Sequence, residues 1–235
     1  MSAPEAVARG LAAVRQAVAG LAAACGRAAD SVQLVAVSKT HPSEAVRAAH
    51  AAGQRDFGEN RVQELRAKAA ALADLPGLRW HWIGSLQTNK VRELLAVPGL
   101  ALLHSLDRVR LADELQRELA RTGRTLDVLL QLHMTDEPTK HGCPPAEARA
   151  LVDHVVGQCP LLRLRGLMAM GPLAGDPSPA FRATASMRDV LQQQCSLELP
   201  VLSMGMSSDL GPAVAAGSTM VRVGTAIFGS RTEQA

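Results

Sequence analysis

Short apolar segments alternate with amphipathic ones along almost the whole chain. An apolar run bounded by Gly, Pro or charged residues is typical of a β-strand buried on both faces. Eight runs come close to this pattern, at 34–38, 55–57, 80–84, 100–104, 127–133, 163–168, 200–204 and 219–223. We predict a strand at each of them.

The segments between these runs repeat apolar residues every three or four positions, which predicts helices with one buried face. They lie at 43–52, 59–71, 87–96, 107–121, 144–157, 178–195 and 209–217. Short polar side chains favour the position that begins a helix. Ser43, Asp107 and Asp209 are therefore predicted to start three of these helices.

The alanine-rich N-terminal segment could be a targeting peptide or a helix of the folded domain. Its larger apolar residues form a single stripe, as in a helix that packs on a core. That stripe consists of Val7, Leu11, Val14, Val18 and Leu21. Because Glu5 is also unusual in a transit peptide, the segment is predicted to be part of the domain.

The regular alternation of strands and helices predicts parallel strands joined by right-handed crossovers. Eight such units in 235 residues match the size of a TIM (β/α)8 barrel, so the predicted fold class is α/β with one domain at 1–235. A doubly wound open sheet is the alternative. That fold normally has a glycine-rich turn after its first strand, whereas SKTHPS contains no glycine.

Composition narrows the possible partners. Apolar residues make up 47% of the chain and charged residues 20%, which excludes disorder. With a net charge of +3, 2% aromatic residues and no basic block, nucleic acid is not expected as a partner. No apolar stretch approaches the length of a membrane span. Four scattered cysteines without metal-ligand spacing predict free thiols in a cytoplasmic protein and no metal site.

Lys39 stands at the end of the first predicted strand, in VAVSKTHP. The simplest interpretation is a solvated lysine at a strand terminus. In a TIM barrel, however, the carboxyl ends of the strands form the active face, so a lysine there is a candidate functional residue.

The ends of the seventh and eighth strands have the features of an anion site. TIM barrels often bind phosphate with these two loops and the N-terminus of a short helix. Ser207 precedes such a helix, while Gly224 and Thr225 follow the last strand. Ser207 could also be an ordinary helix cap, and Gly224 only a tight bend.

A lysine amine opposite a phosphate site suits an aldehyde that carries a phosphate, and pyridoxal 5'-phosphate (PLP) is such a ligand. A sugar phosphate, as in class I aldolases, is an alternative. A nucleophile on the first strand makes that alternative less favourable.

Five segments resemble the pyridoxal phosphate homeostasis proteins, the YggS/PROSC family. They are VAVSKTHP, DFGENRVQEL, WHWIGSLQTNK, RLRGLMAM and LSMGMSSDLGPAVAAGSTMVRVGTAIFG. The resemblance implies an alanine racemase-like barrel in which Lys39 forms a Schiff base with PLP. It also implies that Ser207, Gly224 and Thr225 hold the phosphate, that Arg222 approaches the pyridine nitrogen, and that Asn60 lies beside the ring.

The same resemblance implies an intracellular PLP carrier, with apo PLP-dependent enzymes as recipients and a monomer or weak dimer as the oligomeric state. Many relatives have a second lysine two positions after the first. This chain has His41 there, so a transfer between two lysines is not expected.

The sequence favours binding of PLP over catalysis. A racemase of this barrel type uses a tyrosine as its second acid/base group, and the chain contains no tyrosine. Such enzymes also carry a second β domain, and few residues follow the eighth strand here. We expect no catalytic residues, although a PLP-dependent racemase remains the alternative.

His81, His104 and His133, near strand ends, are expected to be hydrogen-bonded structural residues. Segment 170–180 could be a lid or a plain connection.

Overall fold

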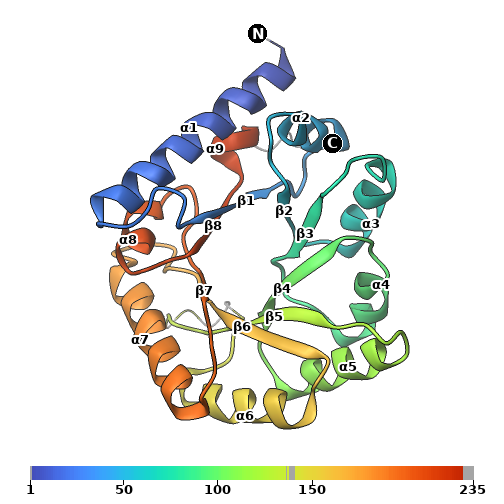
Figure 1. Cartoon of the computed structure of the whole chain (residues 1–235), viewed down its shortest axis with the longest axis vertical. Coiled ribbons are helices and arrows are strands. Elements are labelled where there is room, and N and C mark those ends of the chain that lie inside the picture. Colours follow the sequence, from blue (N-terminus) through green and yellow to red (C-terminus); the bar gives the residue numbers. More distant parts are fainter. Residues whose placement is uncertain (1, 136, 138–140, 230–235) are drawn as a thin grey trace.

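The computed structural model describes residues 2–135, 137 and 141–229, and within them the chain forms a closed barrel of eight parallel strands. The strands follow one another around the barrel in chain order, and β1 pairs with β8 to close it. Figure 1 shows the ring of strands inside a ring of helices. The strands are β1 (Gln33–Val37), β2 (Asp56–Glu59), β3 (Arg79–Trp82), β4 (Leu100–Leu106), β5 (Leu126–Gln131), β6 (Leu162–Met168), β7 (Val201–Ser203) and β8 (Met220–Val223).

Helices cover the outside of the barrel, as the periodicity predicted. They are α1 (Ala3–Ala24), α2 (Ser43–Ala51), α3 (Val62–Ala71), α4 (Val91–Leu95), α5 (Val109–Ala120), α6 (Ala148–Gln158), α7 (Ser178–Cys195), α8 (Leu210–Ala215) and α9 (Thr225–Phe228). Short 3-10 turns at Thr88–Lys90 and Pro145–Glu147 lead into α4 and α6. The predicted TIM barrel is confirmed, and the open sheet is excluded.

The helix boundaries contain the main errors of prediction. The helix predicted from residue 59 begins at Val62, because Glu59 is the last residue of β2 and pairs with Trp82. Helix α2 begins at Ser43, as predicted, with Pro42 in the cap position, whereas Arg108 rather than Asp107 occupies the cap position of α5. Asp209 does occupy the cap position of α8. The four-residue helix α9 was not predicted, because so short a segment has no periodicity to detect.

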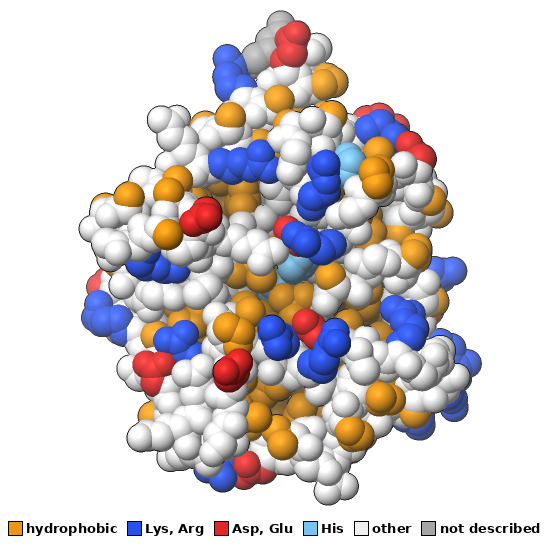
Figure 2. Space-filling view, in the orientation of Figure 1, with side chains coloured by type: hydrophobic (Ala, Val, Ile, Leu, Met, Phe, Trp, Pro, Cys, Tyr) orange, Lys and Arg blue, Asp and Glu red, His pale blue; other side chains and the backbone are white. Residues whose placement is uncertain are grey.

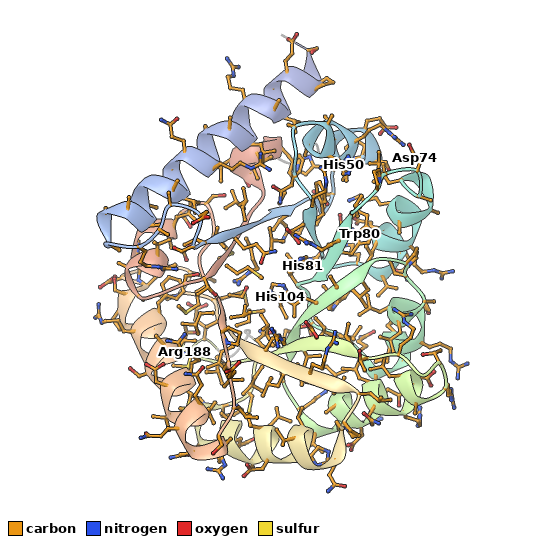
Figure 3. All side chains as sticks on the ribbon, in the orientation of Figure 1. His50, Asp74, Trp80, His81, His104 and Arg188 are labelled. Carbon is orange, nitrogen blue, oxygen red and sulfur yellow. The ribbon has the colours of Figure 1, made fainter. Side chains whose placement is uncertain are left out.

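Alternate residues of each strand face opposite sides of the barrel wall. Phe57, Trp80 and Trp82 belong to the main core between the strands and the helices. A second, smaller apolar cluster, also formed largely by strand residues, consists of Val35, Leu102, Leu129, Met168 and Met220. His81 and His104 lie near the middle of the ring of strands, so polar groups share the barrel interior with apolar ones (Figure 3).

The base of the barrel, where the strands begin, is held by an ion pair. Asp56 and Arg79 face each other in the β2–β3 register, and two hydrogen bonds of 2.7 Å join guanidinium to carboxylate. Burial opposes ionisation of Asp56, but hydrogen bonds from His81 and Arg79 keep the pKa of its carboxyl well below the usual range. The ion pair therefore stabilises the fold most when Asp56 is charged.

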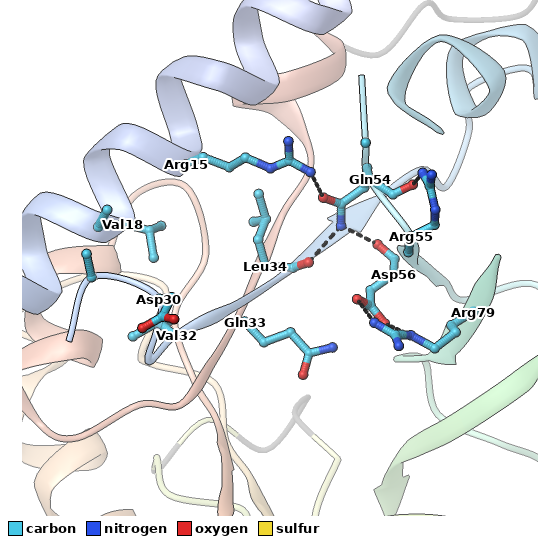
Figure 4. Close-up of a pocket in the computed structure, with 13 residues that line it drawn as sticks. Arg15, Val18, Asp30, Val32, Gln33, Leu34, Gln54, Arg55, Asp56 and Arg79 are labelled. Carbon is cyan, nitrogen blue, oxygen red and sulfur yellow. Dashed lines mark hydrogen bonds and ion pairs between the residues drawn. The ribbon is translucent and has the colours of Figure 1, made fainter. Parts of the chain in front are cut away.

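A cleft of about 500 Å³ opens beside this ion pair (Figure 4). Its cationic side chains already have partners: Arg15 bonds Ala52 and Gln54, and Arg55 bonds backbone carbonyl groups. Basic side chains also stand around the middle of the molecular face in Figure 2. None of the six predicted site residues lines this cleft. We attribute the cleft to packing and assign no ligand to it.

Helix α1 lies against α2, α8 and α9 on the outside of the barrel (Figure 1). Val7, Leu11, Val14 and Val18 are buried as predicted, while Ala22 rather than Leu21 completes the stripe. Gly10 allows α1 to approach α9 closely, because a Cβ atom there would lie 2.8 Å from the carbonyl oxygens of Ala226 and Ile227. The backbones of α1 and α9 are therefore in close contact at Gly10.

We expect Gly10→Ala to destabilise the protein, since its methyl group would meet the backbone of α9. Overpacking of this kind costs about 1–3 kcal/mol. Gly20→Ala is the matched control: it lies in the same helix, its Cβ would have no neighbour within 4 Å, and the better helix propensity should stabilise by about 1 kcal/mol. Urea unfolding of both variants measures the difference. Equal effects would contradict the proposed contact.

We expect Asp56→Asn to lower the free energy of unfolding at pH 7 by about 1–3 kcal/mol, the usual value of hydrogen bonds to a charged group. Because the folded-state pKa is depressed, the contribution is present above the unfolded pKa of about 3.9 and is lost as pH falls below it. The difference between variant and wild type should therefore be constant above about pH 5 and should shrink steadily as pH falls below about 3.9. Asp74→Asn is the control, because its pair with Arg47 is exposed and should change stability little at any pH.

Candidate functional site

All six predicted site residues lie at the carboxyl ends of four neighbouring strands. Going around the barrel, these strands are β7, β8, β1 and β2. Ser207 follows β7, Arg222 is in β8, Gly224 and Thr225 follow β8, Lys39 follows β1, and Asn60 follows β2. The structure thus gathers the six on one arc of the barrel mouth.

The turn that carries Lys39 is fixed on both sides of this residue. The backbone N–H of His41 bonds the carbonyl oxygen of Ser38 at 3.0 Å, and that of Thr40 bonds a carboxylate oxygen of Glu64 at 3.0 Å. Thr40 has φ of 67°, a left-handed conformation that costs energy in a β-branched residue. The half-buried Lys39 therefore sits in a strained turn that its surroundings hold in place.

A buried ion pair next to Ser38 stabilises this turn. Lys68 of α3 donates to Glu59 at 2.6 Å and to the carbonyl oxygen of Ser38 at 2.7 Å, and the Ser38 hydroxyl donates to Glu59 at 2.7 Å. Burial raises the pKa of Glu59, against the opposing effect of Lys68. Removing either partner would leave a polar group buried without compensation.

Sequence reasoning missed Glu59, Glu64 and Lys68. Lys68 shares the buried side of α3 with Val62, Leu65 and Ala69. A lysine on the buried side of a helix needs a buried acceptor. The position of Lys68 on this side could therefore have predicted a buried ion pair. It was missed because Glu59 was assigned to a helix instead of the strand end.

Arg222 is a buried cation with neutral partners only. The side chain is 4% exposed, and its guanidinium donates to the backbone oxygen and the hydroxyl of Ser203 and to the backbone oxygen of Ala169. Within the described chain it forms no ion pair. Burial consequently lowers the pKa of Arg222 to about 10, with Asp209 acting in the opposite direction.

A chain of hydrogen bonds continues from Arg222 across the barrel interior. The Ser203 hydroxyl contacts His104 Nδ1 at 2.9 Å, His104 Nε2 contacts His81 Nδ1 at 3.0 Å, and His81 Nε2 contacts Asp56 at 2.9 Å. Burial, the neighbouring His81 and the charge of Arg222 hold the pKa of His104 well below its usual range. As predicted, both histidines are hydrogen-bonded inside the structure.

Backbone N–H groups are available at the ends of β7 and β8. Those of Ser207, Ser208, Thr225 and Ala226 donate to no described residue. Asp209 instead accepts the N–H of Met206, which closes the turn before α8. Ser207 and Thr225 are exposed, so an anion could reach these groups.

Gly224 and Asn60 have structural neighbours that explain part of their positions. A Cβ atom on Gly224 would lie 2.9 Å from the carbonyl oxygen of Val37, so β1 and β8 approach closely here. Asn60 packs against Gly84 and lines a cleft of about 440 Å³ beside Trp82. Thr225 lines a different cleft, between α1 and α9. A role of Gly224 or Asn60 toward a ligand stays a prediction.

Several other predicted features can be located. Segment 170–180 is irregular up to the start of α7, and Leu173 N–H bonds Glu137; its role as a lid stays a prediction.

All four cysteines are free thiols, as expected. Asp113, His154 and Cys159 bring ligand atoms within 4.8 Å of one another. The carboxylate and imidazole already bond each other at 2.6 Å and burial raises the pKa of the thiol, so we assign no metal. Across the described residues, no helix is both long and apolar enough to span a membrane.

Known proteins resemble this chain over most of its length. The family described as "Alanine racemase, N-terminal domain" matches residues 10–232. The pyridoxal phosphate homeostasis protein of Pseudomonas aeruginosa is 44% identical over 225 residues, which cover 96% of each chain. The human protein of that name is 44% identical over 212 residues, 85% of this chain and 76% of the human one.

A solved structure shares both the sequence and the fold. PipY of Synechococcus elongatus PCC7942, determined with PLP bound, is 43% identical, with a TM-score of 0.83 over 95% of this chain and 100% of that chain. Together with the closed barrel and the residues gathered at its mouth, these similarities show that the chain belongs to the pyridoxal phosphate homeostasis proteins, within the alanine racemase N-terminal domain family.

Proposed function

We propose that the protein binds PLP at the barrel mouth and acts in PLP homeostasis in the cytoplasm, by holding the cofactor as a Schiff base on Lys39 and delivering it to apo-enzymes. The names of the relatives and the PLP in PipY support binding of this ligand. The observation that carries the proposal is the buried Arg222, a cation that forms no ion pair with any carboxylate of the described residues.

Arg222 has the donors that such a ligand needs. A guanidinium carries five N–H groups, and three of its hydrogen bonds go to Ser203 and Ala169. Two N–H groups therefore remain for a ligand that can accept, such as the nitrogen of a pyridine ring. Because a guanidinium has no acceptor and keeps its proton, it can only donate to that nitrogen.

Lys39 provides the amine. Its strained, anchored turn on the strand next to β8 places this residue on the same side of the mouth as Arg222. An amine adds to an aldehyde carbon and loses water to form the C=N bond, which needs the amine in its neutral form. The unpaired N–H groups of Ser207, Ser208, Thr225 and Ala226 would hold the phosphate at the ends of β7 and β8.

The chain's own residues favour a carrier over an enzyme. Bound PLP supplies an electron sink, which is strongest when the ring nitrogen is protonated. Arg222 would oppose that protonation. Many relatives have a lysine at the position of His41. The His41 ring packs on Phe228, with 5.2 Å between the ring centroids. Burial, and to a smaller extent the charge of Lys68, lowers the pKa of His41. A racemase stays the alternative.

We expect borohydride reduction of the PLP-loaded protein to fix PLP on Lys39 alone among the four lysines of the chain. Lys39→Ala should abolish the reducible adduct, because Lys68 is occupied by Glu59. Peptide mass mapping identifies the modified residue. Lys90→Ala is the matched control and should retain the adduct, since the Lys90 ammonium is bonded to Glu93 at 2.7 Å. An adduct on Lys90 or Lys140, the latter outside the described residues, would contradict the assignment.

We expect no exchange of the α-proton of alanine or serine in D₂O by the PLP-loaded protein. An acid/base group contributes about 10²- to 10⁴-fold to such steps, and this chain has no tyrosine to act as the second one. Proton NMR with stoichiometric protein measures the exchange. Exchange at turnover rates that disappears in Lys39→Ala would instead establish the racemase alternative.

A further inference from the structure

We propose that Ser203, His104 and His81 are positioning residues, which hold Arg222 toward the cofactor through a one-way chain of hydrogen bonds that ends on Asp56. The inference rests on the proposed function, in which Arg222 faces the cofactor ring. The hydrogen-bond chain itself is a property of the protein alone, so it can be tested without PLP.

Arg222 fixes the first link of the chain. A guanidinium only donates, so the Ser203 hydroxyl accepts from it at 2.6 Å. The single hydroxyl proton of Ser203 is then free to point at His104 Nδ1, 2.9 Å away. In the proposed chain the hydroxyl uses this proton on His104, so Nδ1 is an acceptor without a proton. A neutral imidazole with a bare Nδ1 carries its proton on Nε2, and that N–H points at His81.

The direction can be derived independently from the other end. The pKa of Asp56 is held well below its usual range, so its carboxylate is ionised and can only accept. His81 Nε2, at 2.9 Å, must consequently carry a proton and donate it. With His81 neutral, its Nδ1 carries no proton and accepts from His104. The same tautomer, with the proton on Nε2 of both histidines, thus satisfies both ends of the chain.

An extra proton would reverse or change links of this chain. A charged His81 would donate to His104 Nε2 and move the proton of His104 to Nδ1, and a charged His104 would donate to Ser203, which would then accept from both His104 and Arg222. Burial, the neighbouring His81 and the charge of Arg222 keep the pKa of His104 low. In the chain as proposed, both histidines are neutral between the charged ends.

The chain fixes the guanidinium because its members come from five strands. Asp56, His81, His104, Ser203 and Arg222 belong to β2, β3, β4, β7 and β8. Strands of a closed barrel do not move independently, so Ser203 Oγ is held at one place and orientation. Arg222 is bound on its Ser203 side, and its remaining donors are left for the ligand. Figure 3 shows His81 and His104 adjacent in the middle of the barrel.

The first measurement is long-range proton–nitrogen NMR of the wild-type protein without added PLP. We expect His81 and His104 to be neutral at pH 7 with the proton on Nε2. A proton on Nδ1 of either ring, or a charged imidazole, would overturn the chain as described.

The second measurement is a PLP titration of Ser203→Ala, which removes the hydroxyl between Arg222 and His104. We expect PLP affinity to fall about tenfold, the effect of one hydrogen bond of about 1.4 kcal/mol. Ser203→Thr keeps the hydroxyl and should keep the wild-type affinity. Ser218→Ala is the matched control: its hydroxyl is equally buried and bonds three carbonyl groups outside the chain. This variant should lose stability but keep the affinity.

The outcomes separate the two proposals. If the wild type binds PLP and both alanine variants bind it equally well, Ser203 does not position Arg222 and the inference is wrong. An equal loss in both variants would also overturn it, because general destabilisation would then explain the effect. If the wild type does not bind PLP, the proposed function fails, and with it the role of Arg222 toward the ring, whatever tautomers the histidines have.

Discussion

The pairing of β1 with β8 is the constraint on which the site depends. It closes the barrel in the register Val35↔Arg222 and Ala36↔Val223. Without closure, the first and last strands would be the edges of an open sheet, far apart in space. With closure, Lys39 and Arg222 come from adjacent strands, although 183 positions separate them in the sequence (222 − 39).

Buried charge is used in two different ways near this junction. Outside the barrel wall, Lys68 and Glu59 neutralise each other and hold the turn of Lys39. Inside it, Arg222 contacts only neutral oxygens among the described residues, and the chain of three side chains that starts at Arg222 ends on Asp56, which is already paired with Arg79. A charge that is paired at contact distance stabilises the fold and is not available to a ligand. A charge whose partner is remote keeps its ability to attract a ligand.

The sequence was sufficient to predict the strands and the barrel, because apolar runs and periodicity are local properties. It also indicated the mouth residues, since their place after a strand decides which face they reach. It could not predict contacts between segments. The strain at Thr40 depends on Glu64, and the burial of Glu59 depends on a lysine from the next helix. Likewise, His81 and His104 were expected to be hydrogen-bonded, but their partnership required the register of β3 and β4.

The direction of the hydrogen-bond chain bears on the difference between holding a cofactor and using it. In the proposed chain each proton points away from Arg222 and toward Asp56, and Arg222 itself does not give up its proton. In the proposed complex, no proton can therefore pass along this route to the ring nitrogen. The ring would keep a neutral nitrogen that accepts from a cation, which is a good arrangement for binding and a poor one for stabilising a carbanion. The interior of the barrel thus favours the carrier role independently of which acid/base groups stand at the mouth.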